Sequence, residues 1–168
     1  MVFNNNNNNV SKGEERGRIL GFDHITLWVG NAKQAATYYC LAFGFTPFAY
    51  RGLETGSRDV VSHVVKQNDI TLEFQSALKP DNKSMGDHMS RHGDGVKDIA
   101  FTVDDIEAVV NRAVGKGAVI LKQIHDLKEG KVRMATIKAF GDTTHTFVER
   151  SDFNGLYLPE YQESPLKV

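Results

Sequence analysis

The sequence predicts an α+β domain in which two βαβββ modules pair into one cupped mixed β-sheet, a half-barrel with the helices outside. Stretches of alternating β-branched and aromatic residues indicate strands, and segments with helical periodicity and capping residues follow the first strand of each module. The order of elements also occurs twice, at the 74-residue offset that separates His24 from Asp98. The modules span about residues 22–76 and 96–150, within a single domain over residues 18–152.

The first module begins with the strand-like run F-D-H-I-T-L-W-V from Phe22 to Val29. Asn31 is a suitable N-cap for the helix that follows, and Gly44 provides its stop. Three further strands are expected over residues 45–51, 58–67 and 69–76, with Asn68 and Asp69 in a tight turn.

The second module repeats this order after a short helix expected over residues 83–91. A strand over residues 96–103 precedes a helix for which Asp104 and Glu107 form a D-x-x-E capping pair, and Gly115 and Gly117 end that helix. Strands are expected over residues 118–125, 131–140 and 143–149, with a turn at Gly141 and Asp142.

Composition excludes several classes of protein. The net charge of −1 gives no electrostatic reason to expect nucleic acid or an anionic membrane as a partner. Cys40 is the only cysteine, so an intrachain disulfide and a cysteine-based zinc site are excluded. Residues 1–17 form an asparagine-rich tail, which we expect to be disordered. With neither a signal sequence nor a membrane-spanning apolar run, the expected location is cytoplasmic.

Paired βαβββ modules resemble the vicinal oxygen chelate superfamily, whose modules enclose a pocket for a metal and a substrate. Because side chains alternate across a strand, His24, Thr26 and Trp28 are expected to face the cup, and so is Gln75. The 74-residue offset places Asp98 at the position of His24 and Glu149 at that of Gln75. The resemblance therefore implies a set of four metal-ligand positions: His24, Gln75, Asp98 and Glu149.

This set differs from that of a non-heme ferrous oxygenase, which presents two histidines and one carboxylate. One imidazole, one amide and two carboxylates suit a harder ion such as manganese or magnesium. The alternative interpretation, which we favour, is a vestigial site whose polar groups hydrogen-bond to one another or to water, with no cofactor in this chain. No catalytic residue is assigned. His63, His88 and His145 have no carboxylate or cysteine at ligand spacing nearby, so they are expected to be surface or hydrogen-bonded histidines.

Six longer stretches resemble one family within that superfamily, and the resemblance covers about residues 16–162. The chain is similar to the N-terminal domain of animal-type 4-hydroxyphenylpyruvate dioxygenases in G-N-A-K-Q-A-A (30–36), Y-R-G-L-E-T-G-S-R (50–58), V-S-H-V-V-K-Q (61–67), M-G-D-H (85–88), H-G-D-G-V-K-D-I-A-F (92–101) and G-D-T-T-H-T (141–146).

The resemblance implies the oxidative decarboxylation, hydroxylation and side-chain migration that convert 4-hydroxyphenylpyruvate to homogentisate in tyrosine catabolism. In full-length family members, two histidines and a glutamate of the C-terminal domain hold Fe(II). None of those ligands can be placed on a residue of this sequence. Residues 153–168, which include G-L-Y-L-P-E-Y at 155–161, resemble the connection to that second domain.

Three hypotheses follow. The first is a non-catalytic module with a structural role, in self-association or in contact with a full-length homologue. The second is a stand-alone divalent-metal enzyme that uses His24, Gln75, Asp98 and Glu149. The third is a fragment of an active dioxygenase.

Overall fold

The computed structural model describes residues 17–127 and 131–168, so all of the predicted tail except Gly17 lies outside the described residues. The first module comprises β1 (Ile19–Trp28), α1 (Ala32–Phe43), β2 (Thr46–Arg51), β3 (Val60–Gln67) and β4 (Ile70–Ala77), with a short 3-10 turn at Leu53–Thr55. The second comprises β5 (Gly95–Val103), α3 (Ile106–Gly115), β6 (Ile120–Asp126), β7 (Arg133–Lys138) and β8 (Thr144–Glu149). Helix α2 (Lys83–His92) joins the modules, and β9 (Gln162–Glu163) lies near the end of the chain.

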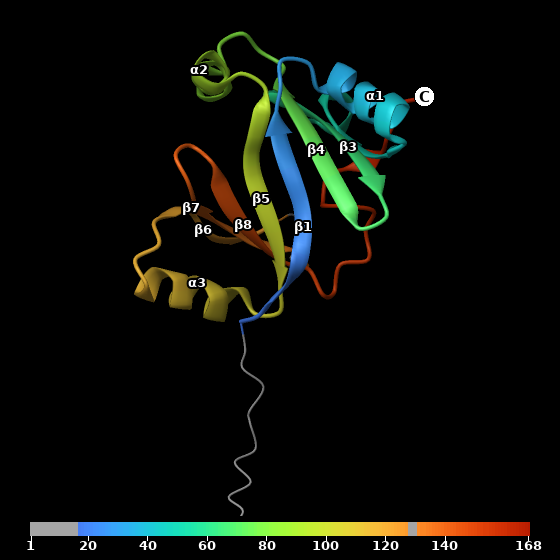
Figure 1. Ribbon diagram of the computed structural model, residues 1–168. Helices are drawn as coiled ribbons and strands as arrows, with labels where there is room; N and C mark the ends of the chain where they lie inside the picture. Colours follow the sequence, from blue (N-terminus) through green and yellow to red (C-terminus); the bar gives the residue numbers. More distant parts are fainter. Residues whose placement is uncertain (1–16, 128–130) are drawn as a thin grey trace, which may run out of the picture.

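The strands form one open mixed sheet in the order β6-β7-β8-β5-β1-β4-β3-β2-β9 (Figure 1). The first strands of the two modules, β1 and β5, pair antiparallel at its centre. On either side the pairing repeats, since β1 lies parallel to β4 and β5 lies parallel to β8. This arrangement confirms the predicted α+β class and the paired modules.

The predicted ends of α1 are confirmed. The Asn31 side chain accepts a 3.0 Å hydrogen bond from the Gln34 amide, and Gly44 ends the helix with φ 74°, a conformation that glycine adopts without strain. The predicted start of α3 is wrong by one residue. Asp105 is its N-cap and accepts from the Ala108 amide at 3.0 Å. Asp104 accepts instead from the amides of Gly17 and Arg18 at the start of the described chain.

The hydrophobic core has three parts because both faces of the curved sheet are covered. Under α1, the buried residues include Ala36, Val65 and Phe74. Under α3, an equivalent cluster includes Val109 and Phe147. The third cluster lies inside the cup and joins the two modules: Ala49, Val64, Ala100, Val132, Val148, Tyr157 and Leu158.

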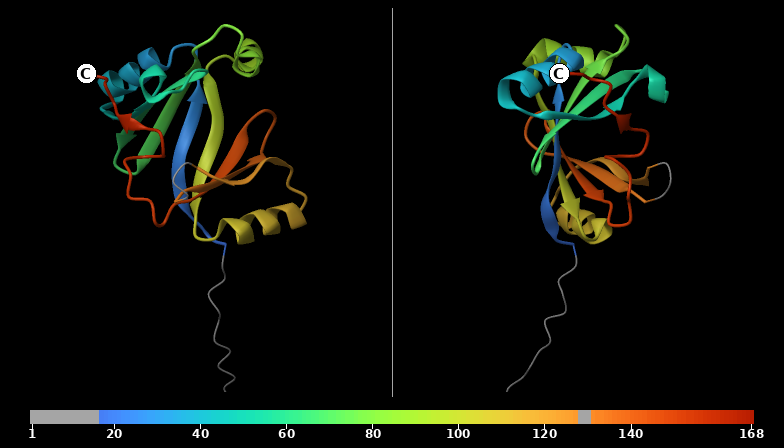
Figure 2. Two further views of the ribbon diagram at one scale, coloured as in Figure 1. Left: turned by 180° about the vertical axis from the view of Figure 1, so that it is seen from behind. Right: turned by 90° about the vertical axis from the view of Figure 1, so that its right-hand side faces the viewer.

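The cup is filled in part by the C-terminal segment, residues 153–168. Tyr157 and Leu158 are buried in the inner cluster, and β9 pairs with β2 through Ala49 and Tyr50. Figure 2 shows this segment, in red, within the curve of the sheet. The core therefore extends past residue 152, the predicted end of the domain, because strand pairing and burial of apolar side chains hold the segment in place. Whether it also connects to a second domain stays a prediction.

A substitution in this segment tests its contribution to the core. Leu158→Ala should lower the free energy of unfolding by about 2–5 kcal/mol, because it removes buried methyl groups and leaves a cavity. Urea denaturation measures the loss. The matched control is Leu41→Ala on the exposed side of α1, where the expected change is within about 0.5 kcal/mol. Equal stability of Leu158→Ala and the unaltered chain would show that the segment lies outside the cooperative fold.

Candidate functional site

A cluster of buried polar side chains lies at the centre of the cup. His24 and Thr26 project from β1, Glu73 from β4 and Asp98 from β5, and all four are buried. They share the cup because their positions on these strands have the same parity. Ile25 and Leu27 lie between them in sequence and pack toward α1. The parity argument for His24, Thr26 and Asp98 is therefore confirmed.

Glu73 is the most heavily hydrogen-bonded member of this cluster. One carboxylate oxygen accepts from the Thr26 hydroxyl at 3.3 Å and the Tyr157 hydroxyl at 3.2 Å. The other accepts from the Gln75 amide at 2.8 Å and from the Tyr161 hydroxyl. Burial, followed by the charge of Glu73, raises the pKa of Tyr157 and that of Tyr161 well above the usual value for tyrosine. Both hydroxyls therefore remain protonated donors at neutral pH, as a buried carboxylate requires.

A second buried carboxylate, that of Asp23, orients the His24 ring. Its Nδ1 lies 2.7 Å from Asp23, and its Nε2 lies 3.9 Å from Glu73. Asp23 and His24 are neighbours in sequence, yet their side chains contact each other. The β1–β5 pairing has an irregular register between Phe22 and His24, at this same point of the strand. Burial alone would raise the pKa of Asp23, but the hydrogen bond to His24 and the charges of His24 and Arg150 outweigh it and lower that pKa.

Asp98 accepts hydrogen bonds from two neutral donors. The hydroxyls of Thr144 and Thr146, both on β8, donate to the same Asp98 oxygen, the latter at 3.0 Å. Burial raises the pKa of Asp98, and these two hydrogen bonds offset only part of that effect.

The structure does not bring all four predicted ligand residues together. Gln75 lies at the rim of the cup, where its oxygen accepts from the Trp28 indole at 3.1 Å and its amide donates to Glu73. Glu149 lies on the opposite face of the sheet. Its carboxylate accepts a 2.7 Å hydrogen bond from the Ile106 amide at the start of α3 and lies 3.5 Å from Arg133. The expectation that Glu149 faces the cup is wrong.

A one-residue shift between the modules explains this result. Thr26 pairs with Glu73 in the first module, whereas the equivalent Ala100 pairs with Thr146 in the second. The offset is therefore 74 residues in the first strand and 73 in the last. Because side chains alternate, that shift turns Glu149 outward and places Val148 in the cup.

The sequence argument also missed three residues of the cluster. Glu73 has the same parity as Gln75 in the run I-T-L-E-F-Q, and its place among apolar residues could have indicated a buried, paired carboxylate. Tyr157 and Tyr161 gave no such signal, since they belong to a segment without strand or helix periodicity.

The donor set of the cup does not fit the ferrous iron of the oxygenase type. That iron takes two imidazoles and one carboxylate with open positions. The cup offers one imidazole, and both of its carboxylates already accept hydrogen bonds from neutral donors. The Tyr157 ring also lies edge-on to His24 at 5.4 Å, so the space before the imidazole holds the chain's own aromatic residue.

The remaining histidines of interest lie outside the cup. His63 faces α1, 5.0 Å from the Tyr50 ring, and burial lowers the pKa of His63. His145 packs against Phe101 at 5.2 Å. We expected His88 to have no carboxylate nearby. That expectation is wrong, because His88, His92 and Asp142 form one cluster.

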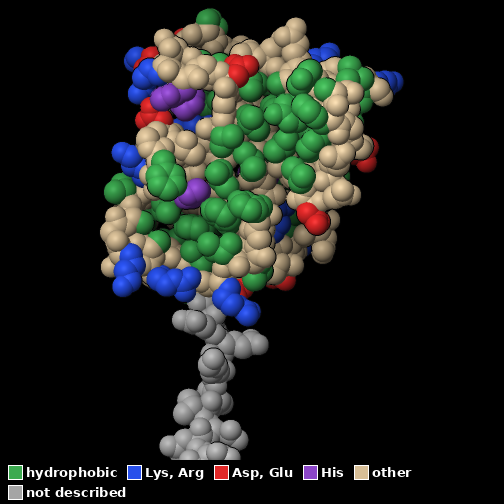
Figure 3. Space-filling model, in the orientation of Figure 1, with side chains coloured by type: hydrophobic (Ala, Val, Ile, Leu, Met, Phe, Trp, Pro, Cys, Tyr) green, Lys and Arg blue, Asp and Glu red, His purple; other side chains and the backbone are tan. Residues whose placement is uncertain are grey.

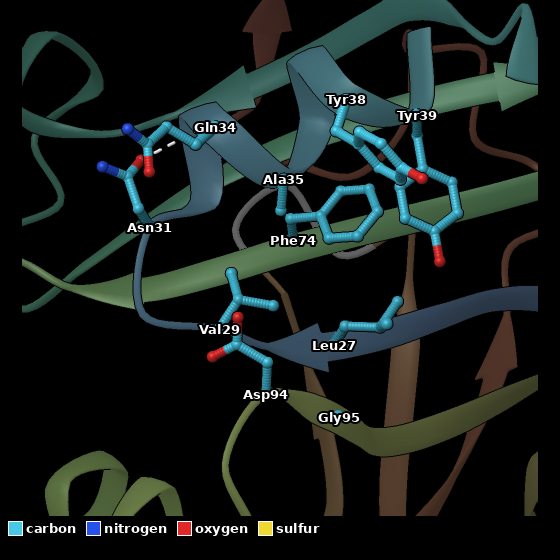
Figure 4. Close-up of a pocket in the computed structure, with 10 residues that line it drawn as sticks. All are labelled: Leu27, Val29, Asn31, Gln34, Ala35, Tyr38, Tyr39, Phe74, Asp94 and Gly95. Carbon is cyan, nitrogen blue, oxygen red and sulfur yellow. Dashed lines mark hydrogen bonds between the residues drawn. The ribbon is translucent and has the colours of Figure 1, made fainter. Parts of the chain in front are cut away.

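Two of the hollows on the surface lie near opposite ends of β1. A groove of about 440 Å³ lies between α1 and the outer face of β1, where Leu27, Phe74 and Tyr39 form its apolar wall and Asn31 and Asp94 its polar end (Figure 4). A hollow of about 700 Å³ lies at the opposite end of β1, next to Asp23 and Tyr157. Neither hollow is lined by His24, Glu73 or Asp98.

Residues 21–149 match the family model of the Glyoxalase/Bleomycin resistance protein/Dioxygenase superfamily. The chain belongs to this superfamily. The match spans both modules and ends at the last residue of β8, so the superfamily assignment agrees with the paired βαβββ architecture.

Several curated relatives of this chain are named 4-hydroxyphenylpyruvate dioxygenase. One from Danio rerio is 55% identical over 159 residues, which cover 92% of this chain and 40% of the relative. Another from Dictyostelium discoideum is 54% identical over 144 residues, covering 84% of this chain and 39% of the relative. The chain thus spans about two fifths of the length of these relatives and corresponds to their N-terminal domain.

Solved structures share the fold of this chain. A triple mutant of 4-hydroxymandelate synthase from Streptomyces coelicolor is 30% identical with a TM-score of 0.75, covering 86% of this chain and 42% of that one. Methylmalonyl-CoA epimerase from Mycobacterium tuberculosis has a TM-score of 0.64 at 16% identity, covering 79% of this chain and 89% of the epimerase. At that identity the epimerase shows a similarity of fold alone.

The raised pKa of Asp98 predicts a pH-dependent stability difference. Between the unfolded pKa of about 3.9 and the higher folded value, the folded state binds more protons, so wild-type stability falls as pH rises. Asp98→Asn keeps an oxygen acceptor for both threonines and never ionises. Its stability relative to wild type should therefore increase from about pH 4 to about pH 7 in urea denaturation. Exposed Asp152→Asn is the control; a difference independent of pH at Asp98 would contradict the argument.

The tyrosine donors to Glu73 should be detectable individually. Tyr161→Phe removes one donor from a buried carboxylate and should lower the free energy of unfolding by about 1–3 kcal/mol. In a Glu73→Gln background the loss should be smaller, because the acceptor is neutral. A double-mutant cycle by urea denaturation measures the coupling, with exposed Tyr38→Phe as the control. Strictly additive effects would show that the hydroxyl and the carboxylate do not interact.

Proposed function

We propose that this chain is the N-terminal, non-catalytic module of a protein of the 4-hydroxyphenylpyruvate dioxygenase type, with a structural role. One observation carries the proposal: the polar centre of its cup is satisfied by the chain itself. Four neutral donors bind Glu73, and two threonines bind Asp98. A module with these internal contacts can keep its fold without a metal or substrate in the cup.

The high identity to dioxygenases supports the family part of this proposal. The tyrosine-catabolic reaction belongs to those whole proteins, and this chain matches only two fifths of their length. We therefore assign turnover of 4-hydroxyphenylpyruvate, and the Fe(II) it needs, to the part of such proteins that lies beyond this match.

The stand-alone metal enzyme is the weaker proposal. It requires His24, Gln75, Asp98 and Glu149 to converge on one ion, and Glu149 binds the start of α3 on the other face of the sheet. His24 and Glu73 approach within 3.9 Å, but the hydroxyls of Tyr157 and Tyr161 already donate to Glu73.

Association with a second copy or with a full-length homologue remains part of the proposal. Hydrophobic side chains gather over the face that carries β1 and β5 (Figure 3). Phe22 is 68% exposed and Ile70 52% exposed, which favours burial against another protein surface. In the described residues no helix is long and apolar enough to cross a membrane. We propose a cytoplasmic location, in keeping with the buried free thiol of Cys40.

A chimera tests the proposed function. Supplied with ferrous ion, ascorbate and 4-hydroxyphenylpyruvate, the 168-residue chain should consume no oxygen above a protein-free control. Replacing the matching two fifths of the Danio rerio relative with this chain should give an active enzyme, because at 55% identity the contacts to the rest of the protein are expected to persist. An oxygen electrode measures both reactions. Turnover by the chain alone, or a folded but inactive chimera, would contradict the proposal.

A further inference from the structure

A second polar cluster lies outside the cup, where α2 meets the turn between β7 and β8. His88 and His92 are one helical turn apart on α2, with ring centroids 4.6 Å apart. The carboxylate of Asp142, in the turn between β7 and β8, lies 2.8 Å from His92 Nε2. The three residues can each offer one ligand atom within 4.8 Å of the other two. We propose that His88, His92 and Asp142 form a binding site for Zn²⁺ or a similar divalent transition metal.

The donor chemistry selects this class of ion. Two imidazoles and one carboxylate suit zinc and other divalent transition metals, ferrous iron included, whereas magnesium and calcium favour sites made of oxygen ligands alone. Two histidines four residues apart on a helix present their rings to the same side, which is the spacing of helical zinc sites. Bond lengths of about 2.0–2.2 Å place tetrahedral zinc ligands about 3.4 Å apart, so modest side-chain rotation completes the site.

Two features near the three residues favour the binding of a cation, and one neighbouring side chain competes with it. Both histidines lie in the C-terminal half of α2, where the helix dipole is negative. Burial, followed by the charge of Lys97, lowers the pKa of His88, and this keeps its imidazole neutral as a metal ligand must be. Arg91 competes, since its guanidinium lies 3.1 Å from the same Asp142 oxygen. That pair is exposed, so its contribution is small and a metal can displace it.

Zinc at this position would join the linking helix α2 to the second module. Two contacts already connect them, because Arg91 and His92 both reach the Asp142 carboxylate. A metal bound only in the folded state would stabilise that state. The site therefore acts as a structural clip, a role separate from the polar cluster of the cup.

Trp28 provides a local reporter. It is the only tryptophan in the chain, and its ring lies edge-on to His88 with centroids 5.0 Å apart. Untagged, chelator-treated full chain would be titrated with Zn²⁺, followed by Trp28 fluorescence and calorimetry. We expect one ion per chain at submillimolar concentration, a change in Trp28 emission, and a rise in Tm of several degrees.

Variants locate the ion. His92→Ala and Asp142→Asn change exposed residues, so they should fold normally and weaken binding by about tenfold or more. Arg91→Ala should tighten binding, because it removes the cation that competes for Asp142. His125→Ala is the matched control and should bind as the unaltered chain does. His24→Ala should also retain binding, which separates this site from the cup. Absence of saturable binding, full binding by His92→Ala, or loss of binding in His24→Ala would overturn the proposal.

Discussion

The fold is organised around a buried carboxylate that must be hydrogen-bonded. Glu73 lies deep in the cup, where an unpaired charge would cost several kcal/mol. One donor, Gln75, is a neighbour on β4. The other three come from distant parts of the sequence: Thr26 on β1, and Tyr157 and Tyr161 in the C-terminal segment. Satisfying this one group therefore requires the central sheet and the C-terminal segment to be assembled together.

The two modules have diverged at this point while keeping the same architecture. The position of Glu73 corresponds to Thr146 in the second module, where Asp98 receives the threonine hydroxyl. Within the polar cluster of the cup, each half thus contributes one carboxylate that accepts from neutral donors, but it comes from the last strand in one module and from the first strand in the other. His24, oriented by Asp23, lies between them as the only imidazole of the cluster.

Local signals in the sequence predicted most of the fold. Asn31, Gly44 and the alternating residues of β1 act through hydrogen bonds and burial within a few residues of themselves, so single positions are informative. The inward placement of His24 and Asp98 followed from the same alternation. Glu149 was misplaced because its predicted face depends on the number of residues between the first and last strands of the module. The second module has one residue fewer there, so the side chain of Glu149 points to the opposite face of the sheet.

The remaining errors have a different physical origin. Tyr157 reaches Glu73 across 84 residues, and His92 reaches Asp142 across 50. Such contacts depend on the curvature of the sheet and on the position of segments that lack strand or helix periodicity. Neither property can be predicted from a short stretch of sequence. The same is true of Asp98, whose acceptor role depends on threonines 46 and 48 residues away.

In this domain, hydroxyl and amide donors take the place that a cation holds in a metal-binding cup. Neutral donors stabilise a carboxylate less strongly per contact than a divalent ion does, but four of them bind Glu73, and two of the four belong to the segment that fills the cup. A metal could reach Glu73 only after Tyr157 and Tyr161 left, which would expose the inner core that they help to bury. Stability of the domain and access to its polar centre are thus opposed, and the packed tyrosines favour stability.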